Sequence, residues 1–335
     1  MDKLIRRIDL SRARGDEARA LLRREWLATN GLGGYASGTI GGTVTWRYHG
    51  LLIAALPAPL GRMVLLNHLA EYIRLPDGRT LQIGGEEPAV PEEGDEPGHC
   101  LTEFRLENGL PVWRYETQQV VLEKRLVFVY GQNTVHVDYQ LLSPQECVRL
   151  ELRPSFHFRG HEHAVTAAPL EGYRLSMIDS RYEVSAPGMP TVRLVLEGDE
   201  AQFTYLGGCR REIFYQKEAD RGSPSRGSLW CPGYFCVTLR PRRNATLIAS
   251  TESWHNMLAL TAEEAVTFYH DRHRRLISLA DPRAQVSPAA DLVLAADQFI
   301  INPVGRLVLA PAVQTAPARS TSATPQAAAM KFQIG

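Results

Sequence analysis

Short segments in which apolar and polar residues alternate follow one another through most of this chain, and they constrain its fold more than any other feature. In residues 134–141 every second side chain is apolar, beginning with Val135, while polar residues such as His136 fall on the opposite face. This alternation is typical of a strand with one buried face. Turn residues at 130–133 separate it from a second strand-like segment at 120–129, so the pattern predicts a hairpin.

Similar segments recur at 148–152, 182–184, 191–196 and 234–239, and helical periodicity is almost absent before residue 255. Frequent short strands between turn signals are typical of antiparallel sandwiches. The chain is therefore predicted to be mainly β, with one large antiparallel β-sandwich.

The pattern changes to helical spacing near residue 258. Thr261 and Glu264 have the spacing of a capping box, which predicts a helix that starts there. Pro288 indicates the start of a second helix, because proline is favoured in the first turn. The expected divisions are a charged lead-in over 1–24, the sandwich over 25–257, helices over 258–301 and a low-complexity, disordered tail over 302–335.

The charge balance excludes several classes of protein. Lys and Arg number 37, as do Asp and Glu, so the formal net charge is zero, and binding to nucleic acid through phosphate neutralisation is not expected. No apolar run approaches the roughly 20 residues that cross a bilayer, and the first residues lack the apolar stretch of a signal peptide. We expect a cytoplasmic protein without nucleic-acid or membrane partners. The five cysteines are scattered, with no C-x-x-C pair, which predicts free thiols in a reducing compartment.

Motifs for common chemistries are weak or missing. Residues 31–36 resemble a dinucleotide-binding turn, but the Gly- and Thr-rich continuation cannot form the helix that such a turn needs. His157, His161 and His163 are close enough in sequence for a zinc site, yet Gly160 interrupts any helix that would align them, and a strand end with exposed histidines is favoured. No G-x-S-x-G motif or distinctive carboxylate pair is present. The sequence predicts no cofactor, no metal ion and no catalytic residue.

An aromatic-rich stretch offers a candidate carbohydrate site. Aromatic rings stack on sugar faces, while amide, guanidinium and imidazole groups form hydrogen bonds with hydroxyls. The alternative is that these rings fill the core of the sandwich. The candidate substrate-binding residues are Asn30, Tyr35, Trp46, Arg47, Tyr48 and His49.

Residues 25–42, which include the string Asn30-Gly-Leu-Gly-Gly-Tyr-Ala-Ser-Gly, resemble the N-terminal domain of bacterial and archaeal glycogen debranching enzymes. The resemblance continues through Arg47-Tyr-His-Gly-Leu-Leu-Ile-Ala-Ala and Pro59-Leu-Gly-Arg-Met-Val-Leu-Leu, and it extends from about Trp26 to about Ile300. It implies a β-sandwich of the super-sandwich type, followed by a linker helix and an (α/α) barrel that carries amylo-α-1,6-glucosidase activity.

Residues 295–300 resemble the first helix of that barrel, and the resemblance then stops. We therefore expect a chain truncated before the catalytic barrel and inactive on its own, because the family's hydrolytic residues have no counterparts here. The first hypothesis is a substrate-binding or structural domain in α-glucan metabolism. The alternatives are a stand-alone module that binds glycogen or maltooligosaccharide, and a non-binding remnant that docks on a separately encoded barrel.

Overall fold

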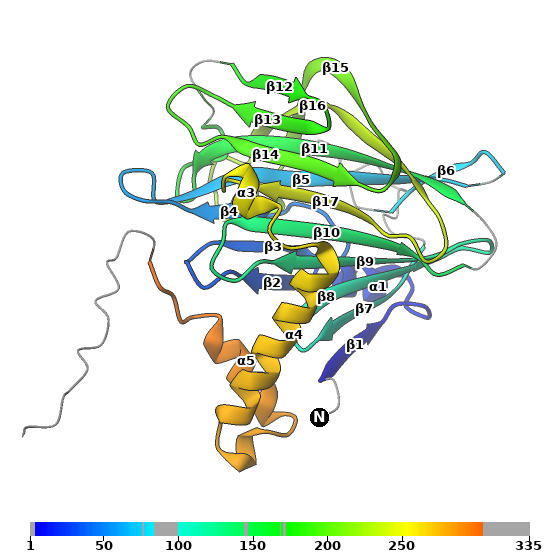
Figure 1. Ribbon diagram of the computed structural model, residues 1–335, viewed down its shortest axis with the longest axis vertical. Helices are drawn as coiled ribbons and strands as arrows, with labels where there is room; N and C mark the ends of the chain where they lie inside the picture. The colour runs from blue at the N-terminus through cyan, green and yellow to red at the C-terminus, as the bar shows by residue number, and fades with distance from the viewer. Residues whose placement is uncertain are drawn as a thin grey trace, which may run out of the picture. The chain divides into compact units, whose positions relative to one another are not determined.

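Two antiparallel sheets face each other and enclose the main core of the protein (Figure 1). The computed structural model describes residues 4–75, 77–83, 100–143, 147–167, 169 and 172–303. The described residues belong to one unit, which spans 1–305. The prediction of a mainly β, antiparallel sandwich is confirmed. Most of the predicted tail over 302–335 lies outside the described residues.

The first sheet has nine strands. In spatial order they are β1 (Ile5–Asp9), β7 (Leu101–Glu107), β8 (Leu110–Glu116), β9 (Val121–Phe128), β10 (Thr134–Leu141), β17 (Ala245–Ser250), β14 (Val192–Glu197), β13 (Arg181–Ser185) and β12 (Arg174–Ile178). The predicted hairpin is formed by β9 and β10, with Val135 opposite Phe128. Within the charged lead-in, β1 extends this sheet by pairing with β7, and the helix α1 (Gly15–Leu22) follows.

The second sheet has eight strands. Its spatial order is β15 (Asp199–Phe214), β16 (Arg226–Leu239), β11 (Val148–Gly160), β5 (Arg62–Arg74), β4 (Gly50–Ala55), β3 (Tyr35–Thr39) and β2 (Glu25–Thr29), and β6 (Thr80–Gln82) pairs with β5 off this path. The short helix α2 (Gln216–Asp220) follows β15. This sheet supplies the strands around the candidate site.

The inner faces of both sheets carry the apolar residues of the core. Val135, Val137 and Tyr139 are fully buried, as their alternation predicts. The prediction of a single buried face for this strand is nevertheless wrong, because His136 on the other face is only 1% exposed. Its cross-strand neighbours on that face are Val127 and Ile248, and helices cover this side of the sheet.

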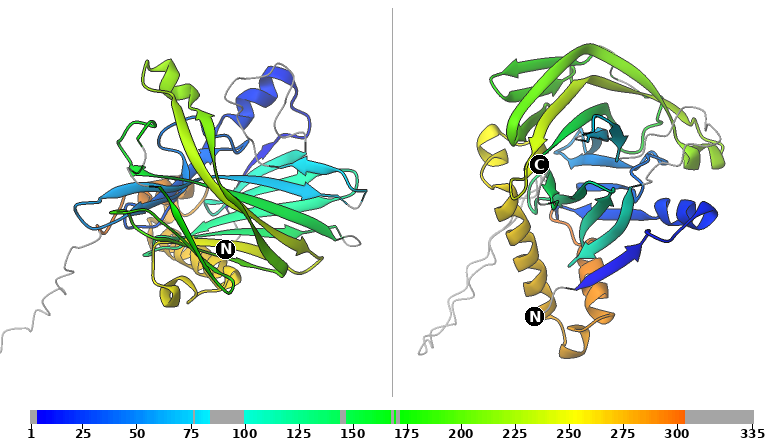
Figure 2. Two further views of the ribbon diagram at one scale, coloured as in Figure 1. Left: turned by 90° about the horizontal axis from the view of Figure 1, so that it is seen from above. Right: turned by 90° about the vertical axis from the view of Figure 1, so that its right-hand side faces the viewer.

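The helices that cover the nine-stranded sheet come from the last part of the unit. The helical elements there are α3 (Trp254–Met257), α4 (Ala262–Leu279), a single 3-10 turn (Pro282–Ala284) and α5 (Ala289–Asp297), and α5 packs on α4. α4 packs Ala265 and Tyr269 against Val127 and Val129, and both long helices lie outside the sheets (Figure 2). The capping box that starts α4 is present as predicted, with Glu264 N donating to Thr261 Oγ1 at 3.3 Å.

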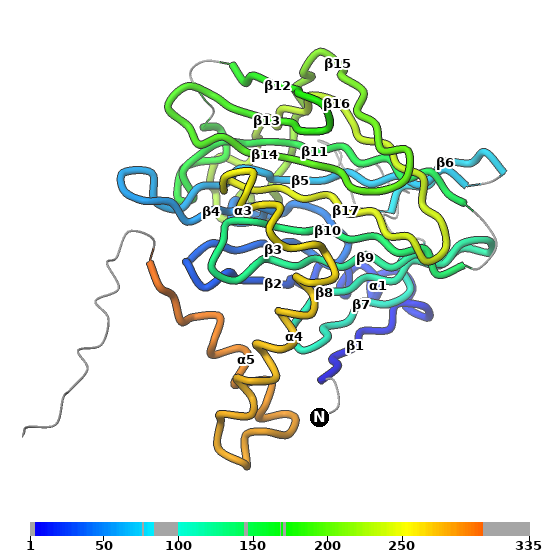
Figure 3. Tube along the Cα trace, viewed as in Figure 1, coloured from blue at the N-terminus to red at the C-terminus, as the bar shows by residue number. Residues whose placement is uncertain are grey.

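After α5 the chain returns to the sandwich, as the chain trace in Figure 3 shows. The amide of Asn302 donates to Gly31 O at 2.7 Å, and Ile301 lies 3.6 Å from the position that a Cβ on Gly33 would take. The described chain therefore ends beside the turn that joins β2 to β3. That turn leads directly into the candidate site.

Candidate functional site

Asn30 builds the turn between β2 and β3. Its Nδ2 donates to Gln132 O at 2.9 Å and to Asn133 Oδ1 at 3.0 Å, while its Oδ1 accepts from Leu32 N and Gly34 N. The side chain is fully buried. Two donated and two accepted bonds saturate an amide, so Asn30 has no free hydrogen-bonding position for a ligand in this conformation.

His49 anchors the loop that connects β3 to β4. It is 2% exposed, and its Nδ1 accepts from Thr45 N at 3.2 Å while its Nε2 lies 3.1 Å from Glu25 Oε1. The hydrogen bond with His49 lowers the pKa of Glu25 to about 2, and Lys217 adds to the effect. Like Asn30, His49 is placed as a structural residue beneath the loop.

The other ring residues form one cluster, which we call the aromatic cluster and define as Tyr35, Trp46, Tyr48 and His161. The His161 ring lies 5.8 Å from Tyr35 and 4.7 Å from Tyr48, and Trp46 meets Tyr48 edge-on at 4.9 Å. All distances are between ring centroids. The hydroxyl of Tyr35 donates to Tyr48 O at 3.0 Å, which ties β3 to the loop. Trp46 and Tyr48 remain partly exposed.

Charged groups surround the aromatic cluster. The Tyr48 hydroxyl donates to Glu162 Oε2 at 2.9 Å, and this bond lowers the pKa of the Glu162 carboxyl. Arg47 forms an ion pair with Glu218 on α2, and the Glu218 side chain is completely buried. The cations of Lys217 and Arg221 lie 5.1 and 4.8 Å from the Trp46 ring. An exposed acid and several donors therefore border the rings.

Arg159 fixes the position of the aromatic cluster from below. It is 2% exposed, and its guanidinium donates to Arg47 O and to His161 O. Burial lowers the pKa of Arg159. One buried cation thus joins the loop that carries Tyr48 to the turn that carries His161, which holds the two rings against each other.

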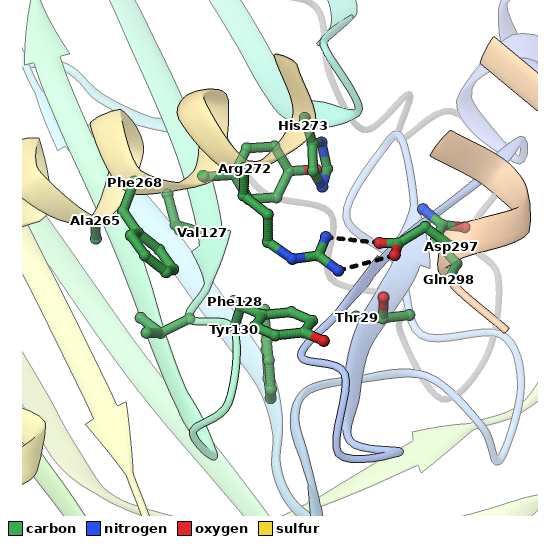
Figure 4. Close-up of a pocket in the computed structure, with 12 residues that line it drawn as sticks. Thr29, Val127, Phe128, Tyr130, Ala265, Phe268, Arg272, His273, Asp297 and Gln298 are labelled. Atoms are coloured by element: carbon green, nitrogen blue, oxygen red, sulfur yellow. Dashed lines mark hydrogen bonds and ion pairs between the residues drawn. The ribbon is translucent and has the colours of Figure 1, made fainter. Parts of the chain in front are cut away.

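Two cavities formed by the described residues are both too small for a sugar ring. One, of about 20 Å³, lies between α4, α5 and the β9–β10 turn and is lined by Tyr130, Arg272 and Asp297 (Figure 4). Another, of about 30 Å³, is lined by Glu71 and Lys124 in the sandwich. Each volume holds about one or two water molecules. Neither cavity can therefore hold a carbohydrate, and the partly exposed rings of the aromatic cluster are the candidate surface.

The three histidines of the 157–163 segment are held separately. His157 is buried against Ala167 O, His161 belongs to the aromatic cluster, and the ring of His163 packs against Gly160. Among the residues that the structure describes, no group of three His, Cys, Asp or Glu side chains is placed to hold a metal ion. In the same part of the chain, no helix has the length and apolar character needed to span a membrane.

Sequence reasoning placed six residues in one candidate site: Asn30, Tyr35, Trp46, Arg47, Tyr48 and His49. The structure brings Tyr35, Trp46, Arg47 and Tyr48 together at the surface, whereas Asn30 and His49 are buried structural residues. Sequence reasoning missed His161 and Glu162 as members of the same surface, although the histidine-rich run was a visible signal. It also missed Lys217, Glu218 and Arg221. The local sequence of α2 does not predict that these residues belong to the site. They contact the loop between β3 and β4 because the pairing of β15 with β16 places α2 beside it.

These features define a β-sandwich domain with an aromatic surface cluster and appended helices. The family described as "Glycogen debranching enzyme N terminal" matches residues 24–246, about two thirds of the chain. The chain therefore belongs to the glycogen debranching enzyme N-terminal family, as the sequence motifs indicate. None of the curated proteins gives a significant match.

Two solved structures match this chain with low sequence identity and low TM-scores. A bacterial glucoamylase complexed with acarbose has 8% identity and a TM-score of 0.30, covering 88% of this chain and 40% of that one. A heparinase III has 8% identity and a TM-score of 0.26, covering 66% of this chain and 30% of that one. This chain thus spans less than half the length of either protein, and both scores are too low to transfer any property to it.

Proposed function

We propose that this chain is a non-catalytic domain of cytoplasmic α-glucan metabolism that holds glycogen or maltooligosaccharide on the aromatic cluster. The observation that carries the proposal is the partial exposure of Trp46 and Tyr48 on a rigid support, with Glu162 and Arg47 beside them. Flat rings bordered by donors and acceptors suit a sugar, whose faces are apolar and whose rim carries hydroxyls. A glucan on Trp46 would displace the exposed Arg221 side chain from the ring.

Affinity electrophoresis in a gel that contains glycogen tests this proposal. Native protein should be retarded, and Trp46→Ala and Tyr48→Ala should each weaken binding about tenfold, or ~1.4 kcal/mol. Tyr205→Ala is the matched control, because Tyr205 is an exposed tyrosine on β15 outside the cluster. Equal mobility of native protein with and without glycogen would exclude the proposed binding.

Hydrolysis is tested separately, with glucose release from a phosphorylase limit dextrin as the readout. We expect no release, because neither of the two cavities among the described residues can hold a glucose unit between a pair of carboxylates. Release at an enzymatic rate that survives repurification would contradict a non-catalytic role.

A second function is favoured by apolar side chains exposed on and around α4 and α5. Large apolar side chains are normally exposed singly, so their concentration in one segment of the chain favours an interaction surface there. Half of the exposed large apolar residues in the described chain fall within 258–301, and Phe299 is 83% exposed. They are Leu258, Phe268, Leu279, Val286, Leu292, Phe299, Ile300 and Ile301. This surface would suit docking on a separately encoded helical barrel.

The docking function is tested by sedimentation of the chain mixed with a purified (α/α)-barrel domain of a debranching enzyme. A complex should form with native protein and be lost in Leu292→Ser/Phe299→Ser. The control is Met177→Ser/Ile178→Ser, which alters two other exposed apolar residues, both on β12. Loss of the complex in the control variant alone would place the docking surface on β12 instead. If native protein forms no complex, the docking proposal is rejected.

A further inference from the structure

Two cysteines that are 22 residues apart in the sequence face each other across neighbouring strands. Cys209 on β15 is paired directly with Cys231 on β16. Directly paired residues in antiparallel strands project to the same face, with Cα atoms about 4.5–5.5 Å apart. A disulfide spans about 4.4–6.8 Å between Cα atoms. The pairing therefore meets the backbone requirement for a disulfide, although both thiols are free in the structure.

A bulge in β15 produces this pairing. Before the bulge Tyr205 is opposite Gly233, and the same register continued would place Gly207 opposite Cys231. Two additional residues on β15 place Cys209 there instead. Gly207 and Gly208 both have φ of +74°, and a Cβ on Gly208 would lie 2.6 Å from Trp230 Nε1. The bulge thus depends on glycine, and it fixes which residue meets Cys231.

The two sulfurs differ in access to solvent. Cys209 is exposed, and its Sγ donates to Cys231 O at 3.5 Å. Cys231 is 8% exposed, and its Sγ donates to Gly233 O at 3.3 Å. Burial raises the pKa of the Cys231 thiol. An oxidant in solution therefore reaches Cys209 first and finds a second thiol held beside it.

We propose that Cys209 and Cys231 are a redox modification site that hydrogen peroxide converts to a reversible disulfide. The Cys209 thiolate attacks one peroxide oxygen, the O–O bond breaks, and the departing hydroxide takes the thiol proton as water. The Cys231 sulfur then attacks the sulfenic sulfur of Cys209, the S–O bond breaks, and a second water leaves with the Cys231 proton. The thiols lose two electrons and the peroxide gains them.

The consequence is a covalent link at the edge of a sheet. β15 is the terminal strand of the eight-stranded sheet, and edge strands open more readily than central ones because one side lacks a strand partner. A Cys209–Cys231 disulfide joins β15 to β16 next to the bulge, and a thiol reductant reverses the link by exchange.

The test treats the reduced full-length protein with hydrogen peroxide, alkylates the remaining thiols and maps the peptides by mass spectrometry. Native protein should give a peptide that joins Cys209 to Cys231, which dithiothreitol separates. In Cys231→Ser, dimedone should label Cys209, because the sulfenic acid then has no resolving thiol. Cys147→Ser is the control, since Cys147 is another exposed thiol, and it should leave the linked peptide unchanged.

Two results would overturn the proposal. One is equal dimedone labelling of Cys209 in native protein and Cys231→Ser, which would show that Cys231 does not resolve the sulfenic acid. The other is a peroxide-treated native protein that retains all five thiols at the dose that labels Cys231→Ser. Since Cys209 is exposed, Cys209→Ser should fold normally, and it must abolish the linked peptide.

Discussion

Arg272 on α4 and Asp297 at the end of α5 form a two-bonded ion pair, with Nη1–Oδ2 and Nη2–Oδ1 distances of 2.6 and 2.8 Å (Figure 4). The Arg272 guanidinium also lies 3.7 Å from the centroid of the Tyr130 ring, in the β9–β10 turn. A single side chain therefore joins both long helices to the sandwich. Because the pair is largely shielded from solvent, with 18% and 13% of the side chains exposed, water screens it less than a surface pair.

Replacing Arg272 by lysine should loosen α5. Lysine keeps the positive charge but cannot form the planar two-bonded contact or stack on Tyr130 in the same way. We expect the free energy of local opening to fall by about 1.5 kcal/mol, so that amides of α5 exchange roughly tenfold faster. Hydrogen exchange with mass spectrometry measures this. Arg274→Lys is the control, since its pair with Asp271 is mostly exposed. Equal exchange in both variants would contradict the prediction.

Glu71 and Lys124 form a buried ion pair that joins the two sheets. Lys124 Nζ lies 2.7 Å from Glu71 Oε2, and the Tyr139 hydroxyl donates to the same carboxylate. Lys124→Met would leave that carboxylate buried without a cation, and we expect a loss of about 3–5 kcal/mol in the free energy of unfolding. Lys124→Met/Glu71→Leu should recover much of the loss. Urea denaturation measures both, and a double variant less stable than Lys124→Met would contradict this explanation.

The strands were predictable because their pattern is local. Val135, Val137 and Tyr139 alternate at period two, and a single register satisfies that alternation. The burial of His136 was not predictable in this way, since the covering helices begin more than 100 residues later. Helix packing on the second face decides it, and no residue near His136 carries that information.

The candidate site was predictable only in part for the same reason. Trp46 and Tyr48 lie in one short loop, so their proximity follows from the sequence alone. The contact of Arg47 with Glu218 joins residues 171 positions apart, and it depends on the order of strands in the sheet. The Cys209–Cys231 pairing likewise depends on a bulge that shifts the register by two residues, which spacing along the chain does not show.

Gly31 is expected to be sensitive to substitution. Its φ is +72°, and a Cβ there would lie 2.2 Å from Cε2 of Tyr130, whose ring also carries the stacked Arg272 guanidinium. Gly31→Ala should lower the free energy of unfolding by about 3 kcal/mol or more, from backbone strain and displacement of the ring. Urea midpoints measure the loss.

Gly131→Ala is the matched control for Gly31→Ala. Its φ is similar, at +79°, but a Cβ there meets nothing within 4 Å. Only the backbone strain of about 1 kcal/mol should remain. Equal losses in the two variants would show that contact with Tyr130 contributes nothing.

His136 should make the protein sensitive to mild acid. Both ring nitrogens are buried without a hydrogen-bond partner, and burial lowers the pKa of His136 to about 4. Because the folded pKa lies below the unfolded value of about 6.5, stability is fully present above pH 6.5 and is lost as the pH falls toward 4. The expected loss is on the order of 3 kcal/mol, since each pKa unit corresponds to about 1.4 kcal/mol.

The variant His136→Leu separates this titration from other effects of acid. At pH 7 it should be about 1 kcal/mol more stable than native protein, because two unpaired polar atoms are replaced by an apolar group between Val127 and Ile248. Between pH 6.5 and 4 its unfolding free energy should fall less steeply. Burial also lowers the pKa of His157 to about 4. The unfolding free energy of His136→Leu will therefore still depend on pH in this range. Urea denaturation across this pH range gives the slope of unfolding free energy against pH for each protein. His255→Leu, which removes an exposed histidine, is the control. Parallel slopes for His136→Leu and native protein would show that His136 is not the acid-sensitive group.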